Sequence, residues 1–240
     1  MPSRRDLLAS LSALWLARTA RATEALKPVQ REAVGARLRR LDELSRALKR
    51  RQISPLDWQR GTEELARGID LPELCRAADF EQVVARLPLL PKGTNVQVID
   101  LLPHQSFTPK IFAMGRGRAI IPHGHDNMVS HHLVLQGELR GRHWERVSDE
   151  PEHLVLRPTI DRVFKPGDSS SISDVRDNVH WFVAQSERAY TLDCIIDNLD
   201  PGRGYRFHID FIDPDRARPR GDGTIRAPRL ELDDALARYG

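Results

Sequence analysis

The chain has 240 residues, of which 40% are hydrophobic and 30% are charged, and its formal net charge is +3. This length suffices for one domain with its own core and an appendage, and no internal repeat points to a solenoid. Residues 1–22 contain four arginines and one aspartate, so the remaining chain is close to neutral and gives no electrostatic reason to expect a nucleic-acid partner.

Residues 1–22 have the organisation of an export signal. Arg4 and Arg5 precede a mildly apolar run, and Ala20-Arg-Ala22 has the pattern of a signal-peptidase site. The arginine pair resembles the twin-arginine signal, although Leu7-Leu8 stands where that signal usually has Phe-Leu. The run is too short for a permanent membrane span. We expect a signal peptide that engages the export machinery, and a periplasmic or otherwise exported protein without a stable membrane anchor after cleavage. The alternative is an ordinary amphipathic first helix.

Residues 23–94 carry helical signals. Between Glu24 and Leu90 the apolar residues recur at spacings of three and four. Ser54-Pro55 predicts a helix start, because a capping serine precedes a proline in the first turn. Asp70 and Asp79 precede two further short helices. We expect this region to form a helical cap on a β-barrel.

Residues 95–212 have a different pattern, in which short β-type runs alternate with Pro, Gly or polar turns. With no helical pattern between them, such runs indicate a mainly β protein with a double-sheet, jelly-roll barrel. Residues 213–240 are expected to be a tail that ends in a short helix over 230–239. The predicted strands are 96–102, 110–114, 119–121, 130–135, 138–147, 152–158, 162–164, 170–173, 180–184, 191–196 and 207–212.

The strongest motif lies within this β region. His123 and His125 are two residues apart, so both side chains share one face of a strand and can hold one metal ion. Their surroundings read G-x5-H-x-H-x4-S-x6-G, which fits the first cupin motif except that Ser130 replaces its glutamate. Residues 163–167 and the later His180 resemble the second cupin motif, with His180 as third ligand. We therefore expect a cupin double-stranded β-helix that presents three imidazoles to a metal.

A three-histidine set resembles that of the thiol dioxygenases, which include cysteine dioxygenase, cysteamine dioxygenase and plant cysteine oxidase. The resemblance implies non-haem Fe(II) and a reaction that combines a small thiol with dioxygen to give a sulfinate. Three imidazoles also suit Mn, Ni, Zn or Cu, so export of an already folded protein lets metal availability in the cytoplasm decide occupancy. Asp193 lies at an offset comparable to an aspartate of the cysteamine-oxidising branch. It is the candidate catalytic residue, steering a substrate amine or a ligand water, and the alternative is a surface or salt-bridged aspartate.

Several residues depart from the family pattern. Ser130 excludes the cysteine–tyrosine crosslink of the animal enzymes, and Thr191, Asp193 and Ile195 replace a Ser-x-His-x-Tyr element. No arginine matches the one that anchors the carboxylate of cysteine, which argues against free cysteine as substrate. The available arginines are Arg116, Arg118, Arg140 and Arg142.

The residues after the first motif are further candidates. Alternation from Met128 turns Ser130 and His132 inward and His131 outward. Ser130 can fill the space of the missing carboxylate, and His132 can contact substrate or support the ligands; the alternative is that both only pack. His104, His143, His153 and His208 have no motif around them.

The two cysteines leave two readings open. Cys75 and Cys194 lie in different segments. They either form one disulfide in an oxidising compartment or remain two buried free thiols.

Three functions fit these features. The first is an exported metal-dependent cupin, specifically an Fe(II) dioxygenase of a small thiol or similar small molecule. The second is a non-catalytic cupin that holds a metal or small ligand, since the fold hosts both kinds of protein. The third, a cofactor-free sugar epimerase, needs a histidine base and a tyrosine acid in the pocket, but Tyr190, Tyr205 and Tyr239 all lie outside the motif strands.

Overall fold

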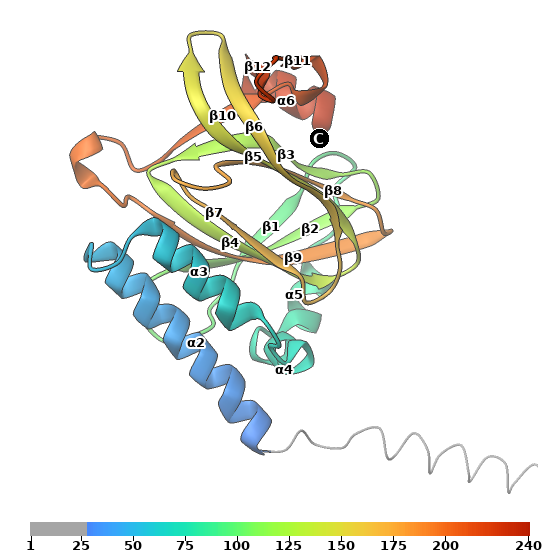
Figure 1. The fold of residues 1–240 in the computed structure, drawn as a ribbon. Helices are drawn as coiled ribbons and strands as arrows, with labels where there is room; N and C mark the ends of the chain where they lie inside the picture. The colour runs from blue at the N-terminus through green and yellow to red at the C-terminus, as the bar shows by residue number, and fades with distance from the viewer. Residues whose placement is uncertain (1–27) are drawn as a thin grey trace, which may run out of the picture.

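The computed structural model describes residues 28–240 (Figure 1), so the predicted signal peptide over residues 1–22 lies outside the described residues. The helices are α2 (Pro28–Lys49), α3 (Pro55–Ala66), α4 (Leu71–Ala77), α5 (Phe80–Arg86) and α6 (Leu232–Tyr239), with 3-10 turns η1 (Pro201–Arg203) and η2 (Pro214–Arg216). The strands are β1 (Asn95–Val98), β2 (Thr108–Gly115), β3 (Ala119–Asp126), β4 (Met128–Gln136), β5 (Leu139–Glu150), β6 (His153–Phe164), β7 (Ser169–Ile172), β8 (Val179–Ala184), β9 (Arg188–Asp197), β10 (His208–Ile212), β11 (Arg218–Pro219) and β12 (Ile225–Leu230).

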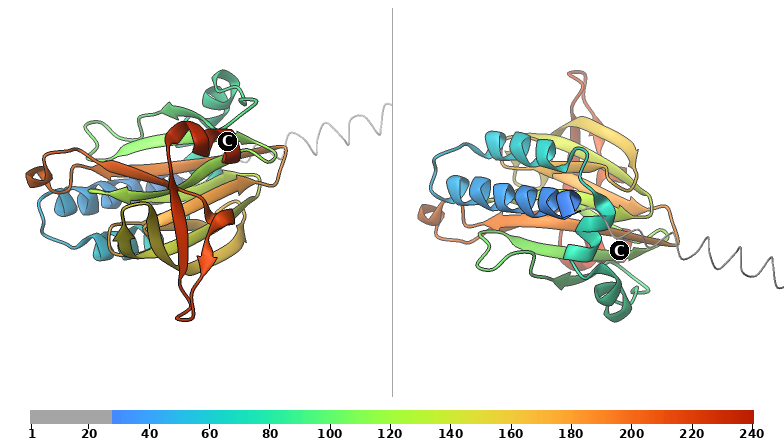
Figure 2. Two further views of the ribbon diagram at one scale, coloured as in Figure 1. Left: turned by 90° about the horizontal axis from the view of Figure 1, so that it is seen from above. Right: turned by 90° about the horizontal axis from the view of Figure 1, so that it is seen from below.

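Two antiparallel sheets form the barrel. One has the strand order β1-β2-β9-β4-β7, and the other has the order β10-β3-β8-β5-β6-β12-β11. Within them, β2-β9-β4-β7 and β3-β8-β5-β6 are the two four-stranded layers of an eight-stranded jelly roll. Figures 1 and 2 show the layers facing each other. The predicted mainly β, cupin double-stranded β-helix with an N-terminal helical segment is therefore confirmed.

The space between the sheets is filled from both sides. Met114, Val134 and Ala189 from the first sheet cluster with Leu139, Phe164 and Phe182 from the second. These side chains occupy one end of the barrel interior and leave the other end for polar residues.

The helices α2 to α5 cover the outer face of the first sheet (Figure 2). Val34, Leu38 and Leu74 from the helices are buried in one cluster with Leu133 and Leu192 from the sheet. At the start of α3, the Ser54 hydroxyl accepts a hydrogen bond from the Asp57 amide at 3.1 Å, which completes the predicted N-cap. Because this outer face is covered, the central strands β4 and β9 of the first sheet are buried on both sides along most of their length.

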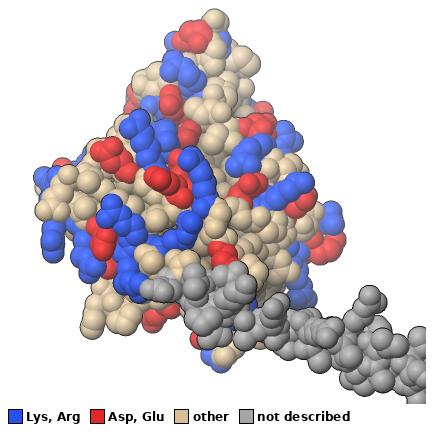
Figure 3. Space-filling view, turned by 60° about the horizontal axis from the view of Figure 1, so that its bottom comes forward, with Lys and Arg blue, Asp and Glu red and all other residues tan. Residues whose placement is uncertain are grey.

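The surface carries charges of both signs. On the face in Figure 3, Lys and Arg are interspersed with Asp and Glu. Two basic residues of α2 follow this pattern, since Arg40 pairs with Glu43 at 2.9 Å and Arg46 pairs with Asp42 at 2.7 Å. Arg51, just beyond the helix, pairs with Asp200 at 2.7 Å. Among residues 28–240, no helix is both long enough and apolar enough to cross a membrane.

The structure differs from the predicted strands at several points: β1 ends at Val98 and not at 102, β3 continues beyond 121 to Asp126, and β11, β6 and β12 also differ. Residues 152–158 and 162–164 belong to one strand, β6, because Pro158 lies beside a bulge at Thr159 of β6, where the pairing with β5 is already interrupted. Strand β12 was not predicted, because it contains Pro228 and two arginines instead of an alternating apolar pattern. Pairing of β12 with β6 and β10 defines it as a strand and joins part of the expected tail to the second sheet.

Candidate metal centre

The three predicted ligands meet inside the barrel. His123 and His125 lie on β3 and His180 lies on β8, and His123 is the direct cross-strand partner of His180. Between the two β3 histidines, Gly124 approaches β8 closely, because a Cβ there would lie 3.0 Å from the Asn178 side chain. A glycine at this position thus lets the two strands approach with both histidines turned inward.

The imidazole rings form a compact cluster. One ring nitrogen from each histidine lies within 4.8 Å of the other two. The His123 ring centroid lies 4.4 Å from those of both His125 and His180, which are 5.1 Å apart. All three side chains are buried, with exposed fractions of 9% or less.

Burial also sets the protonation state of the cluster. It lowers the pKa of His123 to about 4, and it lowers the pKa values of His125 and His180 well below the ordinary value. Neutral imidazoles are the metal-binding form, so these residues fit a cation at neutral pH.

The hydrogen bonds orient two of the rings. His123 Nδ1 donates to the Ile121 carbonyl at 2.7 Å, which leaves Nε2 as its free lone pair. His125 Nδ1 lies 2.9 Å from the Met128 sulfur, and its buried Nε2 has no hydrogen-bond partner among the described residues. The lone pair of His125 Nε2 is therefore buried without a hydrogen bond, beside two other neutral imidazoles. Three such nitrogen lone pairs are suitable ligands for a divalent transition metal.

The inward orientation predicted after the first motif is confirmed. Ser130 and His132 line the same cavity as the three histidines, together with Asp193 from β9. His132 and Asp193 are cross-strand neighbours, and His132 Nδ1 lies 2.7 Å from Asp193 Oδ2. Both side chains are buried, at 5% and 1% exposed. Asp193 is therefore neither a surface residue nor free of partners, because one of its oxygens holds His132.

Three polar atoms of these cavity residues have no hydrogen-bond partner. His132 Nε2, Asp193 Oδ1 and Ser130 Oγ are all buried and lack a hydrogen bond within the described chain. The His132 ring centroid is 4.8 Å from that of His180. Since buried polar atoms normally find partners, these three are suited to contact a bound molecule or its water.

His131 points to the opposite face of the sheet, as predicted. It lines a small apolar space under the helices, together with Leu38 and Cys194. Cys75 and Cys194 are both free thiols in the structure, and they pack in different apolar clusters. Burial raises the pKa of the Cys75 thiol and that of the Cys194 thiol.

One interior histidine was missed by the sequence analysis. His143 on β5 is fully buried and is the cross-strand partner of His180. Its Nε2 lies 3.4 Å from the Ser170 hydroxyl, and burial lowers its pKa to about 3. The only available signal was its place in an inward series with Leu139 and Gly141, which a β-strand at Glu138–Val147 implied but no motif marked.

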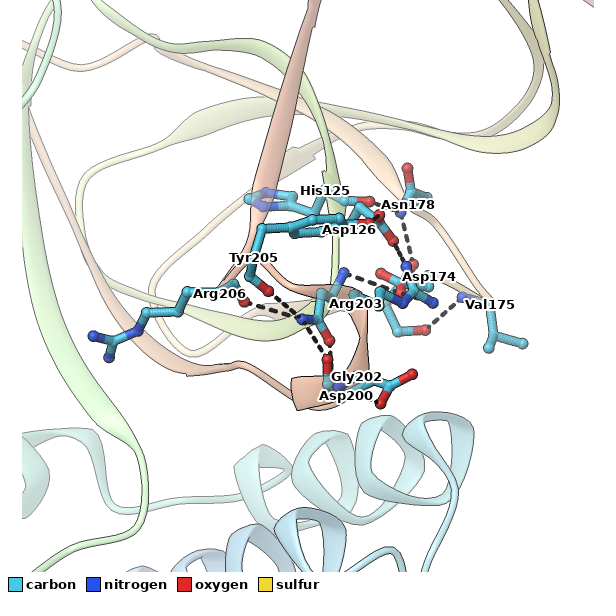
Figure 4. Close-up of polar contacts among 12 residues, drawn as sticks. His125, Asp126, Asp174, Val175, Asn178, Asp200, Gly202, Arg203, Tyr205 and Arg206 are labelled. Carbon is cyan, nitrogen blue, oxygen red and sulfur yellow. Dashed lines mark hydrogen bonds and ion pairs between the residues drawn. The ribbon is translucent and has the colours of Figure 1, made fainter.

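The loops behind the ligands are fixed by amide side chains. Asn178 Nδ2 donates to the His125 carbonyl at 2.6 Å and to the Ser173 carbonyl at 3.2 Å, which ties β3 to the segment before β8. In Figure 4 these contacts adjoin a cluster in which Arg203 and Tyr205 bond Asp126. The position of His125 is thus held from the backbone side as well as through its ring.

The histidines open into a cavity of about 550 Å³, a volume that suits a small organic molecule. None of the four candidate arginines and none of the three tyrosines lines it among the described residues. Arg116 pairs with Glu187, Arg140 and Arg142 pair with Asp161, and Arg118 bonds the Gly240 carbonyl. The cations that do line the cavity are Lys92 and Lys110.

Sequence comparison matches no family model and no curated protein. Among solved structures, the chain is similar to KdgF from Halomonas sp., at 18% identity and a TM-score of 0.32, over 43% of this chain and 77% of that chain. It is also similar to oxalate oxidase in complex with glycolate, at 20% identity and a TM-score of 0.36, over 51% of this chain and 56% of that chain. A third is a conserved protein with a double-stranded β-helix domain from Klebsiella pneumoniae, at 16% identity and a TM-score of 0.37, over 53% and 92%. The chain spans about half the length of the oxalate oxidase it matches, and the fold assignment rests on its own strand order.

Proposed function

We propose that this protein is an exported non-haem iron dioxygenase that acts on a small thiol or a similar small molecule. The observation that carries the proposal is the set of three neutral, buried imidazoles, without a carboxylate among them, at the base of a cavity of about 550 Å³. Three protein ligands on one side of an ion leave further coordination positions for exogenous molecules. The open cavity is where such molecules can reach them.

The proposed reaction adds both atoms of dioxygen to the substrate sulfur, so a thiol RSH becomes a sulfinic acid RSO2H with no other reactant. Fe(II) held by His123, His125 and His180 would supply the redox chemistry that lets ground-state dioxygen react with a thiolate. The protein's contribution is to position the reactants and to keep bulk water out of the buried end of the cavity.

The other polar residues have roles that follow from their contacts. Asp193 Oδ2 fixes His132 in one orientation, so His132 Nε2 accepts a hydrogen bond from the bound substrate. Asp193 Oδ1 is available to a substrate amine or a water molecule. Ser130 occupies the position of the missing carboxylate ligand and leaves room beside the ion.

The test is oxygen consumption by the full chain, loaded anaerobically with Fe(II) and offered a panel of small thiols that includes cysteamine and cysteine. We expect thiol-dependent uptake that disappears in His180→Ala and persists in His208→Ala, an exposed histidine of β10 outside the cavity. No uptake with any thiol, with iron confirmed in the protein, would leave the non-catalytic metal- or ligand-binding cupin as the better assignment.

A further inference from the structure

Two lysines border the metal cavity without forming an ion pair among the described residues. Lys110 is half-buried on the inner face of β2, and Lys92 lies in the exposed segment before β1. By contrast, other basic side chains of the barrel have acidic partners, such as Lys165 with Glu138 and Arg140 with Asp161. Unpaired cations that converge on one cavity favour a negatively charged ligand group.

Lys110 lies in one row of residues with the polar pair of the site. Across the first sheet, Lys110 is paired with Asp193, and Asp193 is paired with His132. Neighbouring strands are about 4.8 Å apart, so the backbone of Lys110 lies about 10 Å from that of His132. The Asp193 carboxylate between them contacts His132 through Oδ2, while its Oδ1 has no partner among the described residues. Lys110 thus forms no ion pair with its cross-strand neighbour, and its ammonium group can contact an incoming anion.

The wall around these lysines is apolar. The cavity is lined by aromatic side chains that include Phe112 and Phe211. Leu90, Phe207 and Leu236 also line it and are 39%, 46% and 40% exposed, which places three of the chain's exposed large apolar side chains around one opening. Apolar groups that remain exposed around a cavity are suited to cover the hydrocarbon part of a ligand.

We propose that the cavity binds an amphipathic organic monoanion. Its carboxylate pairs with the Lys110 ammonium group, with Lys92 adding positive charge at the opening, and its apolar body packs against the aromatic wall. Its other end extends toward the three histidines. This inference rests on the proposed function only in placing the reacting end of the ligand at the metal.

The test is titration calorimetry with hydrocinnamate and its uncharged amide, using full-length protein loaded with Zn²⁺, which binds the imidazoles without redox chemistry. Hydrocinnamate should bind at least about 10-fold more tightly than the amide, and Lys110→Met should reduce its affinity about 10- to 100-fold while leaving the amide unaffected. The control is Lys165→Met, which removes an exposed lysine outside the cavity. The preference for the anion should also weaken with added salt.

Two results would overturn the inference. One is equal affinity of wild-type protein for the acid and the amide. The other is carboxylate binding that survives Lys110→Met but is lost when zinc is removed, because the metal would then hold the anion. Absence of oxygen uptake with full Lys110-dependent binding would instead reject the dioxygenase and retain the anion site.

Discussion

At the scale of single residues, the interior histidines give this protein its chemical character. His123, His125 and His180 were identifiable because their spacing matches a known motif. The interior positions of His143 and Lys110 were not identifiable, because they depend on long-range pairing of β5 with β8 and of β2 with β9. A single charged residue in a short apolar strand gives no sign of which sheet face it occupies, so the cationic wall of the cavity could be found only in three dimensions.

Removal of the His132 partner tests the role of the polar pair. Asp193→Asn retains the shape of the side chain but replaces the carboxylate that holds His132 Nδ1. We expect turnover to fall about 10- to 100-fold while the iron content stays near that of the wild type. Oxygen uptake normalised to bound iron is the measurement, and unchanged turnover would show that the pair only packs.

The buried histidines also predict how stability depends on pH. Burial lowers the pKa of His131 to about 3 and that of His123 to about 4, so these residues stay neutral in the folded protein while they protonate near pH 6.5 in the unfolded chain. The unfolded state therefore binds more protons below pH 6.5, and the free energy of unfolding falls as the pH is lowered.

The expected loss for metal-free protein is about 2 kcal/mol for each such histidine between pH 7 and pH 5. Urea unfolding in the presence of a chelator measures it. His131→Leu, placed in the apolar space under the helices, should reduce the loss by about that amount. An equal pH dependence in the variant and the wild type would mean that His131 is not held neutral in the fold.

At the scale of elements, the junction between β3 and β4 positions the first motif. Asn127 has a φ of 63°, in the left-handed region that asparagine tolerates, and its buried side chain accepts from the Asp200 amide at 2.6 Å and donates to three carbonyl groups of the β9–β10 loop. One side chain thus joins the turn after His125 to a loop that lies more than seventy residues later.

Asn127→Ala should therefore destabilise the protein by about 3 kcal/mol, because it leaves buried backbone groups unsatisfied and places alanine at a positive φ. Asn198→Ala is the matched control, since Asn198 also has a positive φ of 56° but is exposed. The two free energies of unfolding from urea titrations are to be compared. Equal losses in the two variants would show that the hydrogen bonds of Asn127 contribute little.

Most elements were predictable from the sequence because their signals are local. The Ser54-Pro55 start of α3 and the helical spacing in α2 depend on neighbouring residues alone. Strand β12 has no such local signal, and its pairing with residues 153–156 of β6 determines its conformation. The long β6 strand was divided in two for a related reason, since only its pairing with β5, with a bulge at Thr159, shows that Pro158 does not end it.

At the scale of the whole molecule, the three histidines lie between the two sheets of the barrel, and the N-terminal helices cover the outer face of the first sheet. The N-terminal segment, which lies outside the described residues, carries the proposed export function. Arg4→Lys together with Arg5→Lys should abolish periplasmic accumulation, because the twin-arginine route depends on that pair. Cell fractionation measures this, and an unchanged periplasmic yield would reject the assignment.

The central claim is that one metal ion is held by His123, His125 and His180, and the metal content of purified variants tests it most directly. Elemental analysis should find about one transition-metal ion per chain in the wild type and in His208→Ala, whose side chain is exposed, but little in His180→Ala. Circular dichroism of His180→Ala establishes that the variant is folded. Full retention of metal in folded His180→Ala would contradict the three-histidine centre.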